Sequence, residues 1–358
     1  MTGAVTLGVE EEFLLIDPET GQNAPVVEKV LAALPDALRG QSRLEFRHSM
    51  LEMVTPVCTD LVELTDQLTG LRRAAAAAAR EAGVHLVAVG ATPVADPVRE
   101  PTDNPRFRAI ARHYGPIAYD AAVCGCHVHV GVPDRETAVR VCTRLRPWLP
   151  ILQALTVNSP LAAGADTGHA SWRSLQLTRW PALGPTPAFT SASEYDDTVT
   201  TLVSSGTMLD DSMVLWYARP SATYPTVEIR VADVCPTPAD TALLAALVRA
   251  LVATVASDGG GAPVPDHLLE AAHWNAAHTG MDGTLLDVRT GTARPAWDVV
   301  ADLVASVRPA LRRLGDASRV AAELERIRDE GTGAARQRRA LSQGGIPAAL
   351  AEVTVAPG

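Results

Sequence analysis

The sequence predicts an α+β fold: a mainly antiparallel sheet with helices packed behind it and one polar face left open. At least three expected strands carry carboxylates or imidazoles on one face and apolar residues on the other. Antiparallel sheets with one uncovered face show this pattern. Expected helices and strands alternate only loosely, without a repeat of fixed period, which does not favour a regular βα architecture. We therefore expect an active site on the open face of the sheet.

The expected strands are short runs rich in β-branched and other apolar residues, bounded by turn-forming residues. They cover residues 5–17, 43–55, 84–90, 123–131, 212–219 and 226–233.

Side chains that cap helices mark three helix starts, at Asp60, Asp134 and Thr237. Proline lacks the amide hydrogen that a helix interior needs, so Pro147 should kink or split the second helix. Helices are therefore expected over residues 60–83, 134–158, 237–256 and, in several pieces, 295–343.

With 358 residues, of which 47% are apolar and 20% charged, the chain can bury a large core. The stretch DGGGAPVP, residues 258–265, is the best candidate for a domain boundary. The chain after it has too few strands for a mixed core of its own. We therefore expect a single domain over residues 1–358, with a mainly helical section from about residue 263.

The formal net charge of −10 argues against nucleic acid or an anionic membrane as the main partner, because both require clustered lysine and arginine. The apolar stretch 241–257 is interrupted by Arg249, and the chain start runs straight into an acidic strand. Five cysteines are too few for a disulfide scaffold, so reduced thiols are expected. These features predict a soluble, cytoplasmic protein.

Three consecutive glutamates stand inside the first strand, in TLGVEEEFLLID. Because side chains alternate along a strand, Glu10 and Glu12 share one face, whereas Glu11 shares the other with Val9 and Phe13. Two carboxylates on one face lie about 7 Å apart. In a half-buried setting, repulsion and desolvation would raise a carboxyl pKa unless a cation or a donor neutralised the charge.

The segment TVEIRVAD places Glu228 and Arg230 on one strand face and valine and isoleucine side chains on the other. An ion pair on a solvated strand is the ordinary interpretation of one such strand. The segment CGCHVHVG likewise places His127 and His129 together, at a spacing that suits metal ligands. A zinc site with the neighbouring cysteines is disfavoured, because Cys126 points to the opposite face.

The segment RLEFRHSMLEMVTP adds Glu45 and Glu52. Their odd separation places them on opposite faces of a continuous strand, so a shared site requires a bulge or a break near His48 and Ser49. Glu52 stands between apolar neighbours and is the stronger candidate. A salt bridge to an arginine of the same segment is the alternative.

Together these carboxylates and imidazoles favour Mg²⁺ or Mn²⁺ as the bound ion. Hard cations with arginines around them are what phosphoryl transfer from a nucleotide requires. The sequence has no Walker loop and no GxGxxG motif after a strand, so a nucleotide site would be built from metal and arginines.

The chain resembles the carboxylate-amine ligase family related to glutamate–cysteine ligase type 2, in order and across nearly its whole length. The segments that carry the resemblance are GVEEEFLLID, LEMVTPVC, CHVHVGVP, NSPLAAGADTGHASWRS, PTVEIRVAD and AARQRRAL. The resemblance implies a fold like that of glutamine synthetase and the guanido kinases. In that fold, the face of a curved antiparallel sheet holds ATP, divalent metal and an amino-acid substrate.

The resemblance also assigns roles to residues of this sequence. Arg230 and Arg173 match arginines around the transferring phosphate or the substrate carboxylate, and Arg219 with Arg230 would bind the nucleotide. The residues that match metal ligands are Glu10, Glu12, Glu45, Glu52, His127 and Glu228.

One segment departs from the family. Where the family shows a Glu-Asn-Arg-Trp run followed by an arginine and Tyr-Gly, this chain has EAAHWNAAHTGMDG, with His273, Trp274 and His278 in place of part of that pattern. We expect a substrate-recognition or closing segment to be altered, so the cysteine acceptor is not carried over.

The first hypothesis is therefore an ATP-dependent ligase that phosphorylates a carboxylate, the γ-carboxylate of glutamate, and passes it to an amine. Its partners would be small amino acids and amines, with a homo-oligomer compatible with the sequence. A metal-dependent amidohydrolase using His127 and His129 is a second hypothesis, although that class has its HxH motif near the chain start, followed by βα units. A noncatalytic, ligase-like binding protein is the third.

Overall fold

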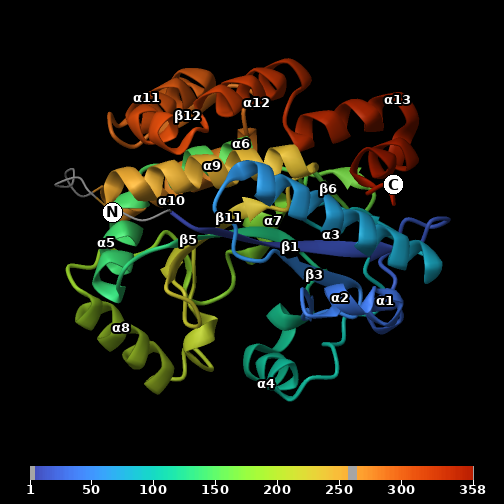
Figure 1. Ribbon diagram of the computed structural model, residues 1–358. Helices are drawn as coiled ribbons and strands as arrows, with labels where there is room; N and C mark the ends of the chain where they lie inside the picture. Colours follow the sequence, from blue (N-terminus) through green and yellow to red (C-terminus); the bar gives the residue numbers. More distant parts are fainter. Residues whose placement is uncertain (1–4, 257–263, 358) are drawn as a thin grey trace.

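The computed structural model describes residues 5–256 and 264–357, and its centre is a seven-stranded antiparallel sheet (Figure 1). The strand order is β10-β11-β5-β1-β3-β2, with β4 paired to the far part of β1. This arrangement is α+β, as predicted. The strands of this sheet are β1 (Leu7–Ile16), β2 (Ser42–Leu44), β3 (Met50–Val54), β4 (His85–Val87), β5 (Gly125–Gly131), β10 (Ala218–Pro220) and β11 (Thr226–Asp233).

Three two-stranded sheets lie outside the central one. They pair β6 (Leu161–Ala162) with β7 (Ala165–Asp166), β8 (Leu183–Gly184) with β9 (Leu215–Trp216), and β12 (Thr284–Asp287) with β13 (Thr292–Pro295).

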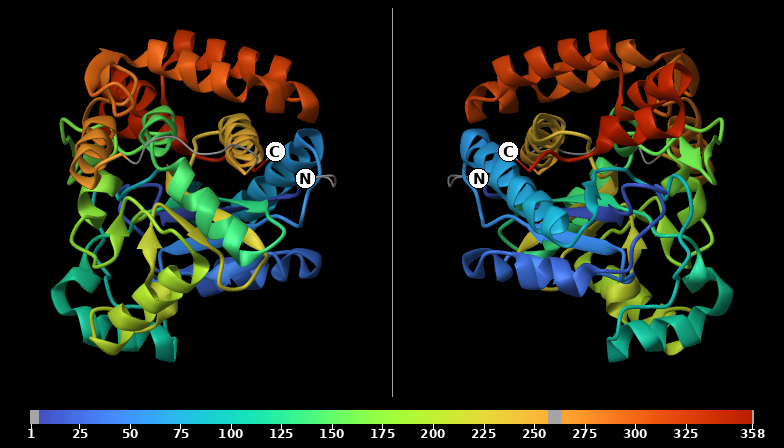
Figure 2. Two further views of the ribbon diagram at one scale, coloured as in Figure 1. Left: turned by 90° about the vertical axis from the view of Figure 1, so that its left-hand side faces the viewer. Right: turned by 90° about the vertical axis from the view of Figure 1, so that its right-hand side faces the viewer.

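Helices cover one face of the central sheet in two layers (Figures 1 and 2). The inner layer holds α3 (Leu61–Glu81), α5 (Arg135–Leu145), α6 (Leu149–Leu155) and α9 (Pro238–Val255). The outer layer holds α11 (Ala296–Leu314), α12 (Ala317–Glu330) and α13 (Gly333–Val353).

The other helices lie at the ends and on the opposite side of the sheet (Figure 2). They are α1 (Val27–Ala33), α2 (Asp36–Arg39), α4 (Pro105–Tyr114), α7 (Trp172–Leu177), α8 (Ala192–Ser204) and α10 (Asp266–Thr279), with 3₁₀ turns at Gly115–Tyr119 and Asp211–Met213.

The helix α9 is the apolar centre of the covered side. Thr237 and Asp240 form a capping box: the Thr237 hydroxyl accepts from the Asp240 amide at 3.2 Å, and the Asp240 carboxylate accepts from the Thr237 amide at 3.1 Å. The helix is long and apolar enough to cross a membrane, but 83% of it is buried inside the fold. Its Arg249 is buried too and pairs with Asp316 at 2.5 Å. It is therefore a core helix, and both of its charged residues are paired, Arg249 with Asp316 and Asp240 with Arg326.

The predicted helix starts are confirmed, because Asp60, Asp134 and Thr237 are the N-caps of α3, α5 and α9. The second predicted helix is split around Pro147 into α5 and α6. The predicted strand 226–233 coincides with β11. The predicted boundary at 258–265 falls mostly on residues 257–263, outside the described residues.

Two of the predictions were wrong: residues 43–55 and 212–219 do not form continuous strands. Residues 43–55 form the hairpin β2–β3, because the carbonyls of Glu45 and Phe46 accept hydrogen bonds from Thr102 instead of joining the sheet. Residues 212–219 begin as a 3₁₀ turn and then change partner: β9 pairs with β8, whereas β10 pairs with β11.

The strand β1 separates the two faces of the sheet through its glutamates. Glu11 points to the covered side and meets Arg72 of α3 at 2.5 and 2.9 Å, with both side chains only 2% exposed. The Thr241 hydroxyl of α9 donates to the same carboxylate at 2.6 Å. Burial alone would lower the pKa of Arg72, but the Glu11 carboxylate outweighs it and raises that pKa. The ion pair therefore ties β1 to α3 and α9.

We predict that Glu11→Gln lowers the free energy of unfolding by about 3 kcal/mol, because it leaves the buried Arg72 guanidinium without its counter-charge. Chemical denaturation measures the change, with Glu19→Gln, an exposed glutamate after the same strand, as the control. If both variants are as stable as the wild type, the Glu11–Arg72 pair does not hold the layers together.

Candidate active site

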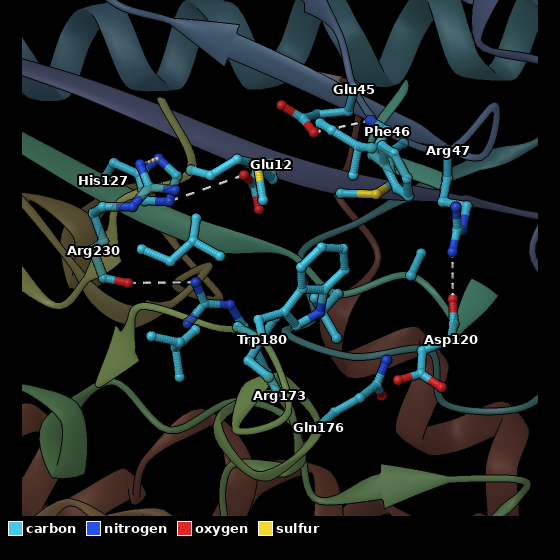
Figure 3. A pocket seen from close by; sticks show the side chains of 18 of the residues that line it. Glu12, Glu45, Phe46, Arg47, Asp120, His127, Arg173, Gln176, Trp180 and Arg230 are labelled. Atoms are coloured by element: carbon cyan, nitrogen blue, oxygen red, sulfur yellow. Dashed lines mark hydrogen bonds and ion pairs between the residues drawn. The ribbon is translucent and has the colours of Figure 1, made fainter. Parts of the chain in front are cut away.

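The open face of the sheet carries a cavity of about 400 Å³ (Figure 3). Eight of the nine residues predicted from the sequence line it: Glu10, Glu12, Glu45, Glu52, His127, Arg173, Arg219 and Arg230. The ninth, Glu228, is 2% exposed and is held in ion pairs with two of the lining arginines. The structure therefore brings together all nine of these residues.

Strand register places the acidic residues opposite one another. Glu12 of β1 lies across from Glu52 of β3, and Glu10 lies across from His127 of β5. Directly opposed side chains in antiparallel strands have Cβ atoms about 5 Å apart, so each pair can share one ion. The chain turns between β2 and β3, and this turn brings Glu45 next to Glu12 and Glu52. A shared site for Glu45 and Glu52 required such a break in the strand.

Glu12, Glu45 and Glu52 form an acidic cluster in which one oxygen of each lies within 4.8 Å of the others. Burial and the neighbouring Glu12 raise the pKa of Glu45 to about 8. Burial, Glu45 and Glu10 raise the pKa of Glu52 well above its usual range. Across the described part of the chain, no lysine or arginine forms an ion pair with any of the three. The acidic cluster is therefore short of positive charge.

Backbone donors hold two carboxylates of the acidic cluster in position. The Gly125 amide donates to Glu12 at 2.5 Å. The Phe46 amide donates to Glu45 at 2.9 Å (Figure 3). The three carboxylates of the cluster, two of them held in this way, offer the oxygen donors that suit a hard divalent cation such as Mg²⁺ or Mn²⁺.

Glu10 lies between the two histidines of β5, at 3.1 Å from His127 Nδ1 and 3.3 Å from His129 Nε2. Burial opposes ionisation of Glu10, but the interactions with His127 and His129 outweigh it and hold the pKa of Glu10 well below its usual range. Burial and the nearby Arg230 lower the pKa of His127, so its imidazole is favoured in the neutral form that binds metals. Glu10, Glu52 and His127 together form a second candidate metal site.

Glu228 is already neutralised by two arginines. Arg219 Nε donates to it at 2.8 Å, and Arg230 forms a close ion pair with it. Burial opposes ionisation here too, but Arg230 and Arg219 hold the pKa of Glu228 well below its usual range. A metal ligand role for Glu228 would therefore require at least one arginine to turn to another anion, such as a phosphate.

Arg173 enters the cavity from the short helix α7. Its Nη1 lies 3.9 Å from Asp233, its Nη2 lies 3.4 Å from the carbonyl of Arg230, and its buried Nε has no hydrogen-bond partner (Figure 3). A Cβ at Gly125 would collide with the guanidinium, so a larger residue on β5 at this point would displace Arg173. Arg173 therefore retains donor capacity for an anion.

Sequence analysis missed the apolar half of the cavity, which packs around Trp180 and Phe46 (Figure 3). Buried Arg47 also lines it and donates to the carbonyl of Asp120 at 2.7 Å. Phe46 and Arg47 directly follow Glu45, so their place in the chain was the one available signal. The other apolar residues of this half include Phe107, Ile110, Ile117, Leu177, Leu183, Met213 and Leu215.

The departing segment forms α10, and its residues divide between interior and surface. His273 is buried against the ring of Tyr217, which lines the cavity. Trp274 and His278 stack on each other with centroids 4.9 Å apart, and neither lines the cavity. At these two positions, no direct contact with the cavity supports the expected change in substrate recognition.

A carboxylate- and arginine-lined cavity on an antiparallel sheet defines the class of protein: an enzyme whose site can bind charged groups. The antiparallel strands also argue against the barrel of βα units that an amidohydrolase would use. Cys126 lies in the core on the covered side, away from the two histidines, which removes support for a zinc site.

Comparison with known proteins identifies the family. Residues 6–352 match the family model described as "Glutamate-cysteine ligase family 2", and the chain belongs to this family. The protein is thus an ATP-dependent carbon–nitrogen ligase. It is 62% identical over 344 residues to a protein of Salinispora arenicola named "Putative glutamate--cysteine ligase 2", covering 95% of this chain and 91% of the relative. A relative from Saccharopolyspora erythraea is 49% identical over 337 residues, 93% of this chain and 89% of the relative.

Two solved structures share the fold. A glutamate–cysteine ligase from Francisella tularensis in complex with AMP superposes with a TM-score of 0.71 at 12% identity, covering 98% of this chain and 87% of that one. A bifunctional glutathione synthetase from Pasteurella multocida gives 0.72 at 15% identity and covers 98% of this chain. This chain corresponds to 51% of the Pasteurella protein.

The raised pKa of Glu45 predicts how the metal-free protein responds to pH. Because this pKa rises from 4.5 to about 8 on folding, the folded state binds more protons than the unfolded state between these values. Stability contributed by Glu45 should therefore fall as pH rises through this window. We predict that Glu45→Gln matches the wild type near pH 5 and exceeds its thermal midpoint by about 3 °C or more at pH 8.

The measurement is the difference in thermal midpoint between the two proteins in EDTA, from pH 5 to pH 8. Mn²⁺ should then stabilise the wild type more than Glu45→Gln, because the variant has lost one ligand. A midpoint difference that does not change with pH would contradict the repulsion within the acidic cluster.

Proposed function

We propose that the protein joins the γ-carboxylate of glutamate to an amine through an acyl phosphate formed from ATP. The observation that carries this proposal is the acidic cluster, which faces Arg173 and Arg230 across one cavity. Carboxylates that need cations and arginines that retain donors are the two elements of phosphoryl transfer. Membership of the ligase family supports the same reaction class.

The donor set fits divalent metal. Glu12, Glu45 and Glu52 would hold one ion, and Glu10 with His127 would hold another together with Glu52. Such ions would supply positive charge that offsets the charge of the ATP phosphates. Glu228 would join them only when Arg219 and Arg230 engage the nucleotide phosphates.

The reaction then has two steps. In the first, an oxygen of the γ-carboxylate forms a bond to the γ-phosphorus of ATP, and the bond to the bridging oxygen breaks to release ADP. Arg230 and Arg173 neutralise the transferring phosphoryl group, whose charge spreads over its oxygens.

In the second step, the amine nitrogen attacks the carbonyl carbon, and the bond from that carbon to the phosphate oxygen breaks. The amine nitrogen gives up a proton, which the departing phosphate takes, and the phosphate leaves with the electron pair of the broken bond. The unpaired Nε of Arg173 is available to donate to the tetrahedral oxyanion.

We also propose that the fold is of the glutamine synthetase and guanido kinase type, which the open antiparallel sheet supports, and that the chain is one domain. The packing of α11 and α12 on α9 supports the second point, because the helical section shares the core of the sheet.

Mass spectrometry tests the function directly. The protein is incubated with Mg²⁺, ATP, glutamate and a panel of amines, and a product lighter than its parents by one water should form only with ATP. Glutamate carrying ¹⁸O in its γ-carboxylate should transfer one label to inorganic phosphate, because the attacking oxygen leaves with phosphorus. Amide formation with unlabelled phosphate would contradict the acyl phosphate, and no ATP-dependent amide would contradict the function.

We predict that Arg230→Lys lowers turnover by about a hundredfold while the fold is retained, because lysine keeps the charge without the planar fork that matches phosphate oxygens. Arg39→Lys, at an exposed ion pair of α2, is the control. Steady-state kinetics and circular dichroism measure both effects. Near wild-type turnover in Arg230→Lys would remove this arginine from the mechanism.

A further inference from the structure

A continuous row of buried hydrogen bonds leads from α10 to Arg173. It begins at His273, which is 3% exposed and does not line the cavity. His273 Nδ1 lies 2.5 Å from Oε1 of Gln153 on α6, and Gln153 Nε2 donates to the Ser174 hydroxyl at 2.9 Å. We call the whole row, from His273 to Asp233, the serine relay.

The serine relay ends at the carboxylate beside Arg173. The hydroxyls of Ser174 and Ser171 lie 2.8 Å apart, and the Ser171 hydroxyl donates to Asp233 Oδ1 at 2.9 Å. The same oxygen is the one 3.9 Å from Arg173 Nη1. Ser171 is also the N-cap of α7, the helix that carries Arg173. The position of Ser171 therefore affects Arg173 in two ways, through the start of α7 and through the Asp233 carboxylate beside the guanidinium.

The direction of every bond in the serine relay is determined by its ends. Asp233 accepts from Ser171, so the single proton of Ser171 is used and Ser174 must donate to Ser171. The oxygen of Ser174 is then free to accept from the Gln153 amide nitrogen, which requires Gln153 Oε1 to point at His273. Burial lowers the pKa of His273 to about 3, so the ring is neutral and Nδ1 carries its one proton.

Without the Nδ1 donor of His273, the Gln153 amide would no longer be held in this orientation. The Gln153 amide could turn by half a rotation and present its oxygen to Ser174. Ser174 would then donate to Gln153, and the bond that it gives to Ser171 would be lost.

We propose that His273 is a positioning residue for Arg173 and acts through the serine relay. The inference rests on the proposed function, because Arg173 is the group that meets the phosphoryl and acyl centres there. His273 fixes the amide of Gln153, and the two serines pass this orientation to Asp233 and to the start of α7.

Packing offers a competing explanation, since the His273 ring lies 4.4 Å from the ring of Tyr217 in the cavity wall. The two explanations differ in what a substitution must preserve. If the Nδ1 donor matters, asparagine at residue 273 should serve, because its amide nitrogen can take the place of Nδ1. If ring packing matters, asparagine and leucine should be equally poor.

The test compares His273→Asn, His273→Leu and the control His267→Leu, which makes the same change at an exposed histidine of the same helix. Crystal structures of the full-length proteins give the distances from Ser174 to Ser171 and from Asp233 to Arg173. Kinetics in parallel give kcat and KM for ATP and for glutamate.

We expect His273→Leu to open the contact between the two serine hydroxyls, move the Arg173 guanidinium and lower kcat by about tenfold or more, with KM for ATP within about twofold. His273→Asn and His267→Leu should keep the geometry and stay within about threefold of wild-type kcat.

An unchanged Arg173 and an intact serine relay in His273→Leu would overturn the proposal, as would His273→Asn failing as completely as His273→Leu. The crystallographic comparison does not depend on catalysis. A wild-type protein that makes no ATP-dependent amide would refute the proposed function, and the crystal structures would still decide whether His273 holds Arg173 in place.

Discussion

The main constraint on the structure is the lack of positively charged partners for the carboxylates on the open face of its central sheet. Strand register and the turn after β2 bring Glu12, Glu45 and Glu52 to within 4.8 Å of one another, and no lysine or arginine of the described chain forms an ion pair with them. Burial prevents water from screening their repulsion, which is why two of the three have raised pKa values. Such an arrangement is stable as an ionised set only when a cation completes it.

The glutamates on the two faces of β1 have different surroundings. Glu11 on the covered side meets Arg72 and Thr241 within the chain, so its charge is satisfied and contributes to the core. Glu10 meets two histidines, and Glu12 meets mainly other carboxylates. Beside them, Arg219 and Arg230 share Glu228 while Arg173 keeps an unpaired donor. The cavity thus holds carboxylates that lack a paired lysine or arginine within the described chain, next to arginines already engaged with Glu228.

Periodicity and capping signals made much of this predictable from sequence. Alternation alone separated Glu11 from its neighbours and placed Glu228 with Arg230 on β11. It could not predict the turn that joins Glu45 to Glu52, because Thr102, far along the chain, takes the carbonyls that would have extended the strand. Trp180 and Arg47 were missed for a similar reason: tertiary contacts, and no local pattern, bring them to the cavity.

Anomalous diffraction from crystals grown with Mn²⁺ and an ATP analogue would show whether the open-face carboxylates are cation ligands. We expect an anomalous peak at direct coordination distance from oxygens of Glu12, Glu45 and Glu52. A second peak is expected beside Glu10 and His127. Crystals that bind the nucleotide but show no peak at the three carboxylates would refute their role as cation ligands.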